Sequence, residues 1–129
     1  MEGEEMDLKR FQENYPDMKR VKLWVYVPRE NVAEVRMAMG AAGGGIIGNY
    51  SYCAFVTEGT GHFFPEEGAT PAIGELGRIE SVPEARIEIE LSLDKVQAVI
   101  QAIEETHPYE EVPIDILPLF ERDWFSAKS

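Results

Sequence analysis

The sequence predicts an α+β domain in which two helices cover one face of a four-stranded antiparallel sheet. Four segments have the composition or alternation of strands, and two segments with helical spacing of apolar residues lie between the first and second strands and between the third and fourth. The resulting order, βαββαβ, is that of the split βαβ or ferredoxin-like fold. At 129 residues the chain has the length of one ordinary domain.

The first strand is predicted at residues 21–27, where the run VKLWVYV is rich in β-branched and aromatic side chains and ends at Pro28. The alternate residues that would share one face are Leu23, Val25 and Val27. After Pro28 the apolar residues take helical spacing, at Val32, Val35 and Met39. This helix should end at Gly43, because glycine is the common residue just past a helix C-terminus.

Ten of the eleven glycines lie between positions 40 and 77, so turns should be concentrated in that third of the chain. Within it, residues 49–58 predict a second strand, and residues 59–77 form a long connection of the kind that is usually functional or oligomer-forming. A third strand is predicted at 78–91, with Pro83 marking a break or bulge. Its apolar residues alternate with charged ones, which indicates one buried and one exposed face.

The second helix is predicted from the apolar stripe Val96, Val99, Ile100 and Ile103, with Ser92 or Asp94 as its cap. It must end before Pro108. A last strand is predicted at 112–119, where prolines favour an edge position. The expected division is an N-terminal arm or short helix at 1–20, the ferredoxin-like domain at 21–119 and a C-terminal tail at 120–129.

The charge and composition of the chain exclude several classes of function. Twelve basic and 24 acidic side chains give a formal net charge of -12, which disfavours nucleic acid and anionic membrane surfaces as partners. Cys53 is the only cysteine, so the chain has no internal disulfide and a reducing compartment fits it best. The acidic N-terminus lacks the pattern of a secretory signal, and the longest uncharged run is too short to span a membrane. We therefore expect a cytoplasmic protein.

The glycines at 43, 45 and 48 match the letters of the dinucleotide fingerprint G-x-G-x-x-G. They follow a predicted helix and precede a predicted strand, whereas the fingerprint needs the reverse order to place a pyrophosphate at a helix N-terminus. A Rossmann-type nucleotide site is therefore not expected.

Two segments carry the only histidines, each beside carboxylates. In the 59–77 connection, His62 with Glu66 and Glu67 could offer nitrogen and oxygen ligands to a divalent ion, although such a loop can also carry acids merely for solubility. The adjacent pair Phe63 and Phe64 should pack against the domain or against a neighbouring subunit.

The second histidine lies in the run HPYEEVP at 107–113. Its residues fit a helix stop, in which Pro108 ends the helix and Tyr109 buries its ring. They also fit a site, in which His107 is a ligand or a general base and Glu110 or Glu111 orients it or shares a metal.

Four blocks of the sequence together resemble a known family. They are GNYSYCAF at 48–55, GTGHFFPEEGATPAIGELG at 59–77, ESVPEARIE at 80–88 and HPYEEVPIDILPL at 107–119. They resemble the CutA/PII-like insert domain of the YqfO branch of the Nif-three-like (NGG-one-interacting-factor-three) family. More distantly, the HPYE run followed by valine and proline is similar to the ending of CutA divalent-cation-tolerance proteins, whose run is one residue shorter.

The resemblance implies a ferredoxin-like fold and a homotrimer of the kind that CutA and PII proteins form. Nif-three-like proteins hold a dinuclear metal centre and are often labelled cyclohydrolase-like, but the ligands of that centre belong to the halves that flank the insert, so that chemistry is not carried over. PII relatives bind nucleotides with basic side chains, and the 59–77 connection has no lysine or arginine. From CutA, four residues map directly: His107, Pro108, Tyr109 and Glu110.

These observations favour a non-enzymatic binding or regulatory protein whose trimer clefts gather the 59–77 connection and the HPYEE turn from neighbouring chains. The ligand would be a small molecule or a divalent metal ion. The residues expected to bind a ligand are His107, Tyr109, Glu110, Gly59 and Gly61. The residues expected to hold a metal are His62, Glu66, Glu67, His107 and Glu110.

Two further functions stay open on the sequence. The chain could be a pure oligomerisation or capping module for a partner protein, with interface anchors at Phe63, Phe64, Trp124 and Phe125. It could also be a metal-assisted hydrolase that uses His107 and Glu110 as acid and base, although no nucleophile accompanies them.

Overall fold

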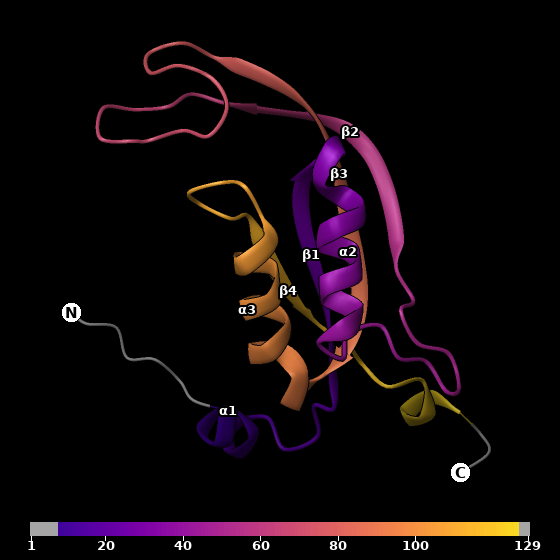
Figure 1. Ribbon diagram of the computed structural model, residues 1–129. Coiled ribbons are helices and arrows are strands. Elements are labelled where there is room, and N and C mark those ends of the chain that lie inside the picture. The colour runs from indigo at the N-terminus through magenta and orange to yellow at the C-terminus, as the bar shows by residue number, and fades with distance from the viewer. Residues whose placement is uncertain (1–7, 127–129) are drawn as a thin grey trace.

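The computed structural model describes residues 8–126, so residues 1–7 of the expected arm and 127–129 of the expected tail lie outside the described residues. The helices are α1 (Leu8–Asn14), α2 (Val32–Ala41) and α3 (Val96–Thr106), and the strands are β1 (Arg20–Pro28), β2 (Phe55–Phe63), β3 (Glu80–Ser92) and β4 (Ile114–Pro118). The strands form one antiparallel sheet in the order β2-β3-β1-β4. Helices α2 and α3 lie together on one face of it (Figure 1), which confirms the predicted α+β, ferredoxin-like fold.

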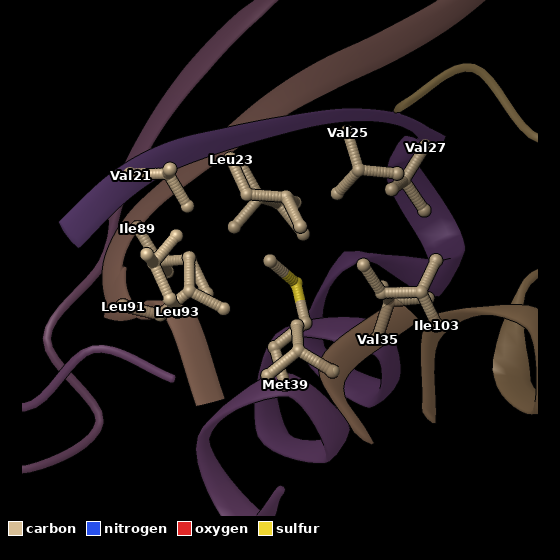
Figure 2. Packing of buried hydrophobic residues seen from close by; sticks show 12 residues of the cluster. Val21, Leu23, Val25, Val27, Val35, Met39, Ile89, Leu91, Leu93 and Ile103 are labelled. Atoms are coloured by element: carbon tan, nitrogen blue, oxygen red, sulfur yellow. The ribbon is translucent and has the colours of Figure 1, made fainter. Parts of the chain in front are cut away.

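The core lies between the sheet and these two helices. Figure 2 shows the side chains of β1 and of Val35, Met39 and Ile103 pointing toward one another. Alternate residues of β1 are buried, as their period of two predicts, and so are alternate residues of β3 from Ala85 to Leu91. The polar residues between them lie on the opposite face of the sheet, which neither α2 nor α3 covers.

The end of α2 follows from its glycines. Gly43 has φ +104°, and the N–H groups of Gly43 and Gly44 donate to the carbonyls of Gly40 and Met39, both at 3.0 Å. These two bonds are those of a Schellman motif, and the predicted stop at Gly43 is confirmed. The start of α3 differs from prediction, because a 3₁₀ turn over Leu93–Lys95 precedes it and neither Ser92 nor Asp94 caps it.

The second strand lies six residues later than its predicted start at 49. A turn closed by a bridge between Ile47 and Tyr50 is followed by an irregular segment over 51–54, in which Tyr52 has φ +60° and the Cys53 N–H donates to the Gly45 carbonyl at 2.8 Å. The strand instead runs through Gly59 and Gly61, because pairing with the long β3 outweighs the low strand propensity of glycine. The break or bulge predicted at Pro83 is also absent: Pro83 pairs with Thr60 in continuous register, beyond the end of β1, where β3 has a single neighbour.

Strands β2 and β3 continue as a two-stranded arm beyond the rest of the sheet. Pairing of β1 with β3 ends at Pro28 and Glu84, whereas β2 and β3 stay paired as far as Phe63 and Glu80. The 64–79 loop at the tip of this arm reaches over the end of α3 (Figure 1). Among residues 8–126, every helix is too short to cross a lipid bilayer.

Candidate functional site

A cavity of about 370 Å³ lies where the arm, the 64–79 loop and the turn after α3 come together. Most of its wall is apolar, with a few polar groups, as is common for small-molecule sites of this size. The arm and its loop contribute Gly61, His62, Phe63, Pro65, Ala69, Pro71, Ala72 and Ile73. The two central strands and the turn contribute Tyr26, Glu84, Tyr109, Glu110, Glu111 and Pro113.

A carboxylate and a phenol form the polar centre of this cavity. Glu84 is only 9% exposed, and the hydroxyl of Tyr109 donates to its Oε2 at 2.6 Å. Burial, and then the hydrogen bond and the charge of Glu84, raise the pKa of Tyr109 well above its ordinary value. Tyr109 is therefore a neutral donor at physiological pH, and Glu84 keeps its other oxygen for a further partner.

Gly61 makes room for this pair. A Cβ added at Gly61 would overlap the carboxylate of Glu84, which lies across β2 at that point. A Cβ at Gly59, one pleat earlier on the same strand, would meet nothing within 4 Å. Of the two glycines expected at the site, Gly61 lines the cavity and lies against the Glu84 carboxylate, whereas Gly59 does neither.

Glu110 fastens the loop to the turn. The backbone N–H of Thr70 donates to Oε1 of Glu110 at 2.8 Å, so the 64–79 loop is held over the cavity by a carboxylate of the HPYEE run. The base of the loop is closed by a bond from the Gly77 N–H to the Pro65 carbonyl at 2.9 Å. The two segments that were expected to meet between neighbouring chains thus already meet within one chain.

His107 lies behind the cavity, not in its wall. It is 8% exposed, its Nε2 lies 2.7 Å from the Tyr26 carbonyl, and its Nδ1 accepts the Tyr109 N–H at 3.1 Å. These partners require the neutral tautomer with the proton on Nε2. Both ring nitrogens are therefore occupied by the backbone, and the ring positions Tyr109, with ring centroids 5.0 Å apart.

The five residues expected to hold a metal do not gather in one chain. His62 lines the cavity, with Nδ1 3.0 Å from Ser81 Oγ, and Glu110 lines it as well. Glu66 and Glu67 are exposed on the loop and take no part in the cavity wall, and neither does His107. In residues 8–126, no three histidine, cysteine or acidic side chains form a group that could hold a metal ion.

Two central residues of the cavity were missed from the sequence, Glu84 and Tyr26. Glu84 occupies a polar position in the alternation of β3, where a charged residue is normally solvated. Its burial comes from Tyr109, which is 25 residues distant in sequence. The residues next to Glu84 in the sequence therefore could not have indicated that its side chain is buried.

Comparison with known proteins relates the chain to two groups. No protein-family model matches the chain. The chain is 52% identical over 98 residues to the protein named "GTP cyclohydrolase 1 type 2 homolog" of Bacillus subtilis, covering 76% of this chain and 26% of that protein. It is 46% identical over 97 residues to the protein of the same name from Mycobacterium leprae, covering 74% and 25%. The chain thus spans about a quarter of the length of the curated relatives it matches.

Solved structures give the same result. A Bacillus cereus protein related to NIF3 has a TM-score of 0.71 at 44% identity, covering 81% of this chain and 26% of its own. CutA1 from Oryza sativa has a TM-score of 0.58 at 14% identity, covering 81% and 83%. The divalent ion tolerance protein CutA1 from Ehrlichia chaffeensis has a TM-score of 0.59 at 18% identity, covering 84% and 90%. The resemblance read from the sequence is confirmed, and the CutA1 structures support the fold.

Proposed function

We propose that this chain, which corresponds to one quarter of the Nif-three-like proteins and shares the CutA fold, is a non-enzymatic small-ligand-binding and regulatory module. The observation that carries the proposal is the cavity beneath the 64–79 loop, with the buried Glu84–Tyr109 pair at its centre. A mostly apolar cavity with few convergent polar groups is the usual form of a ligand site.

The attachment of the loop suggests how binding would be transmitted. The loop is tied to the turn by the single Thr70–Glu110 bond, and it carries Phe64, Leu76 and Ile79 with exposed fractions of 46%, 52% and 73%. A ligand that enters the cavity would contact the loop and so shift these exposed apolar side chains. A neighbouring subunit or partner would respond to that change.

Binding fits the geometry better than hydrolysis does. An acid and base pair of His107 and Glu110 would require His107 to give up a hydrogen bond to the Tyr26 carbonyl or the Tyr109 N–H. Glu110 is likewise engaged by the loop backbone. The cyclohydrolase name belongs to proteins about four times as long as the matched segment, and we do not extend their activity to it.

The homotrimer implied by the resemblance is part of the proposal and is supported by unpartnered surfaces. Strand β2 is an edge strand with a largely exposed burial pattern, including Phe55 at 66%. The aromatic residues of the C-terminal segment, Phe120, Trp124 and Phe125, are 70%, 45% and 74% exposed, and their rings contact one another. Edges and apolar patches of this kind are normally covered by another chain.

These surfaces also favour the second candidate, a pure oligomerisation or capping module. In that case the exposed Phe64 and the C-terminal aromatic residues would be the anchors, whereas Phe63 faces the cavity and packs 6.2 Å from Tyr109. A divalent metal as the ligand would require side chains from neighbouring chains of the trimer. We also propose a reducing, cytoplasmic location, because the free Cys53 has no partner cysteine within the chain.

The test is native mass spectrometry of the purified protein, followed by denaturation to release and identify bound molecules. Wild type is compared with Ala72→Phe, which fills the cavity from an exposed loop position, and with Ala54→Phe, which adds the same ring at an exposed position outside the cavity. We expect a retained molecule in wild type and Ala54→Phe that is lost from Ala72→Phe. An assembled protein that is empty in all three variants favours the oligomerisation module instead.

A further inference from the structure

The cavity wall has an unbalanced charge. Three carboxylates line it, those of Glu84, Glu110 and Glu111, and its wall contains no lysine or arginine. The net charge of the whole chain is -12, which adds a long-range attraction for cations and a repulsion for anions. An anionic ligand such as a nucleotide would therefore meet like charge at Glu84, Glu110 and Glu111, with no lysine or arginine in the wall to offset it.

The excess of negative charge is concentrated at Glu84. The residue is 9% exposed, and no lysine or arginine forms an ion pair with it among residues 8–126. Its single hydrogen bond comes from the neutral hydroxyl of Tyr109, whereas an ionised carboxylate can accept about four. A buried charge is costly unless a counter-charge accompanies it. A cationic donor in the cavity would supply the counter-charge that the described part of the chain does not give Glu84.

Aromatic residues share the cavity wall with this carboxylate. Tyr26, Phe63 and Tyr109 line the cavity, and the rings of Phe63 and Tyr109 lie 6.2 Å apart at 57°. Aromatic faces attract ammonium and guanidinium groups through their quadrupole. Apart from Gly61, His62 and the acidic residues, the rest of the wall consists of proline, alanine and isoleucine side chains, mostly from the loop, which suit an apolar body better than a hydrated metal ion.

On the basis of the proposed binding function, we propose that the cavity binds an organic cation, an ammonium or guanidinium group on a compact apolar body, with Glu84 as its counter-ion. The cationic group lies between the free oxygen of Glu84 and the aromatic rings, and the apolar body lies under the 64–79 loop. A bare divalent ion is disfavoured because no three suitable ligands meet in the described part of the chain, and because the cavity of about 370 Å³ is far larger than an ion needs.

The test uses three probes of the same shape and different charge: benzylammonium, benzyl alcohol and benzoate. Their dissociation constants are measured by isothermal titration calorimetry on wild-type protein, with magnesium chloride as a fourth titrant. We expect benzylammonium to bind at least about tenfold more tightly than benzyl alcohol, and benzoate to bind more weakly than either. Equal binding of the three organic probes, or tighter binding of magnesium, overturns the proposal.

A pair of variants separates the local charge from the overall charge. Glu84→Gln keeps the shape and an acceptor for Tyr109 but removes the charge, so benzylammonium affinity should fall about tenfold or more while benzyl alcohol affinity is unchanged. Glu58→Gln removes the same charge from an exposed residue that pairs with Arg29 outside the cavity, and it should leave both affinities unchanged. Equal losses in the two variants would show a general electrostatic effect and contradict the proposal.

Failure of the cation assignment can be distinguished from failure of the proposed ligand-binding function. Thermal unfolding of each variant shows that it is folded. If the Ala72→Phe-sensitive molecule copurifies with the protein and is neutral or anionic, the cavity is a ligand site but the cation assignment is wrong. If it is an amine or guanidine released by Glu84→Gln, both conclusions are supported.

Discussion

Replacing Gly61 by alanine tests the steric arrangement at the centre of the site. The added Cβ would overlap the carboxylate of Glu84, so the end of this flexible side chain must move and its 2.6 Å bond from Tyr109 is weakened. A hydrogen bond to a charged group contributes about 1.5–3 kcal/mol. Because Glu84 is 9% exposed, water does not fully replace that bond. We therefore expect the free energy of unfolding, from urea denaturation at pH 7, to fall by an amount whose upper limit is about 1.5–3 kcal/mol, the loss of the whole bond.

The matched control is Gly59→Ala on the same strand. A Cβ there meets nothing within 4 Å, and alanine is a slightly better strand residue than glycine, so stability should stay the same or rise by up to about 1 kcal/mol. A second readout is the titration of Tyr109 by ultraviolet absorbance, since loss of the Glu84 bond lowers its pKa toward the ordinary value. Equal stability of Gly61→Ala and Gly59→Ala would refute the reasoning.

Three further variants test the hydrogen bonds around the site. Tyr109→Phe removes the only donor to a buried carboxylate and should cost about 1.5–3 kcal/mol by urea denaturation at pH 7. Because folding raises the pKa of Tyr109, the stability that its protonated hydroxyl contributes is present below about pH 10 and is lost as the pH rises above that value. The wild type should therefore lose more stability than Tyr109→Phe between pH 9 and 11. Parallel curves of stability against pH for the two proteins would contradict the assignment. His107→Leu leaves the Tyr26 carbonyl and the Tyr109 N–H without partners, and should lower the free energy of unfolding by about 1–3 kcal/mol for each. Hydrogen exchange at the Tyr109 amide should become faster. An unchanged exchange rate would show that the His107 ring does not position the turn. Glu110→Ala should accelerate hydrogen exchange at the Thr70 amide and change global stability by less than about 1 kcal/mol, whereas unaltered exchange would mean that other contacts hold the loop.

The fold could be predicted from the sequence because its periodic segments are long and its core is regular. The alternation in β3 and the helical stripes of α2 and α3 each identify one buried face, and Gly43 ends α2 where expected. The error at β2 has a physical cause. The run at 49–54, with its two tyrosines, was predicted as strand but lies in the end of a turn and an irregular segment, while two glycines with low strand propensity are held in the strand by pairing with β3.

The candidate site could be predicted only in part, because its chemistry depends on contacts between distant segments. The HPYEE run was recognised, and Tyr109, Glu110, Gly61 and His62 do line the cavity. The role of Glu84 depends on a residue 25 positions away and on an arm that folds back over the turn. A charged residue on the polar side of a strand gives no local sign of such burial.

A crystal structure of the protein as purified, without added ligands, tests the central claim most directly. We expect electron density for a small molecule in the cavity beneath the 64–79 loop, within hydrogen-bonding distance of the free carboxylate oxygen of Glu84. A cavity filled by side chains of a neighbouring subunit, or closed by collapse of the loop onto Tyr109, would contradict the account and leave assembly as the function of this surface.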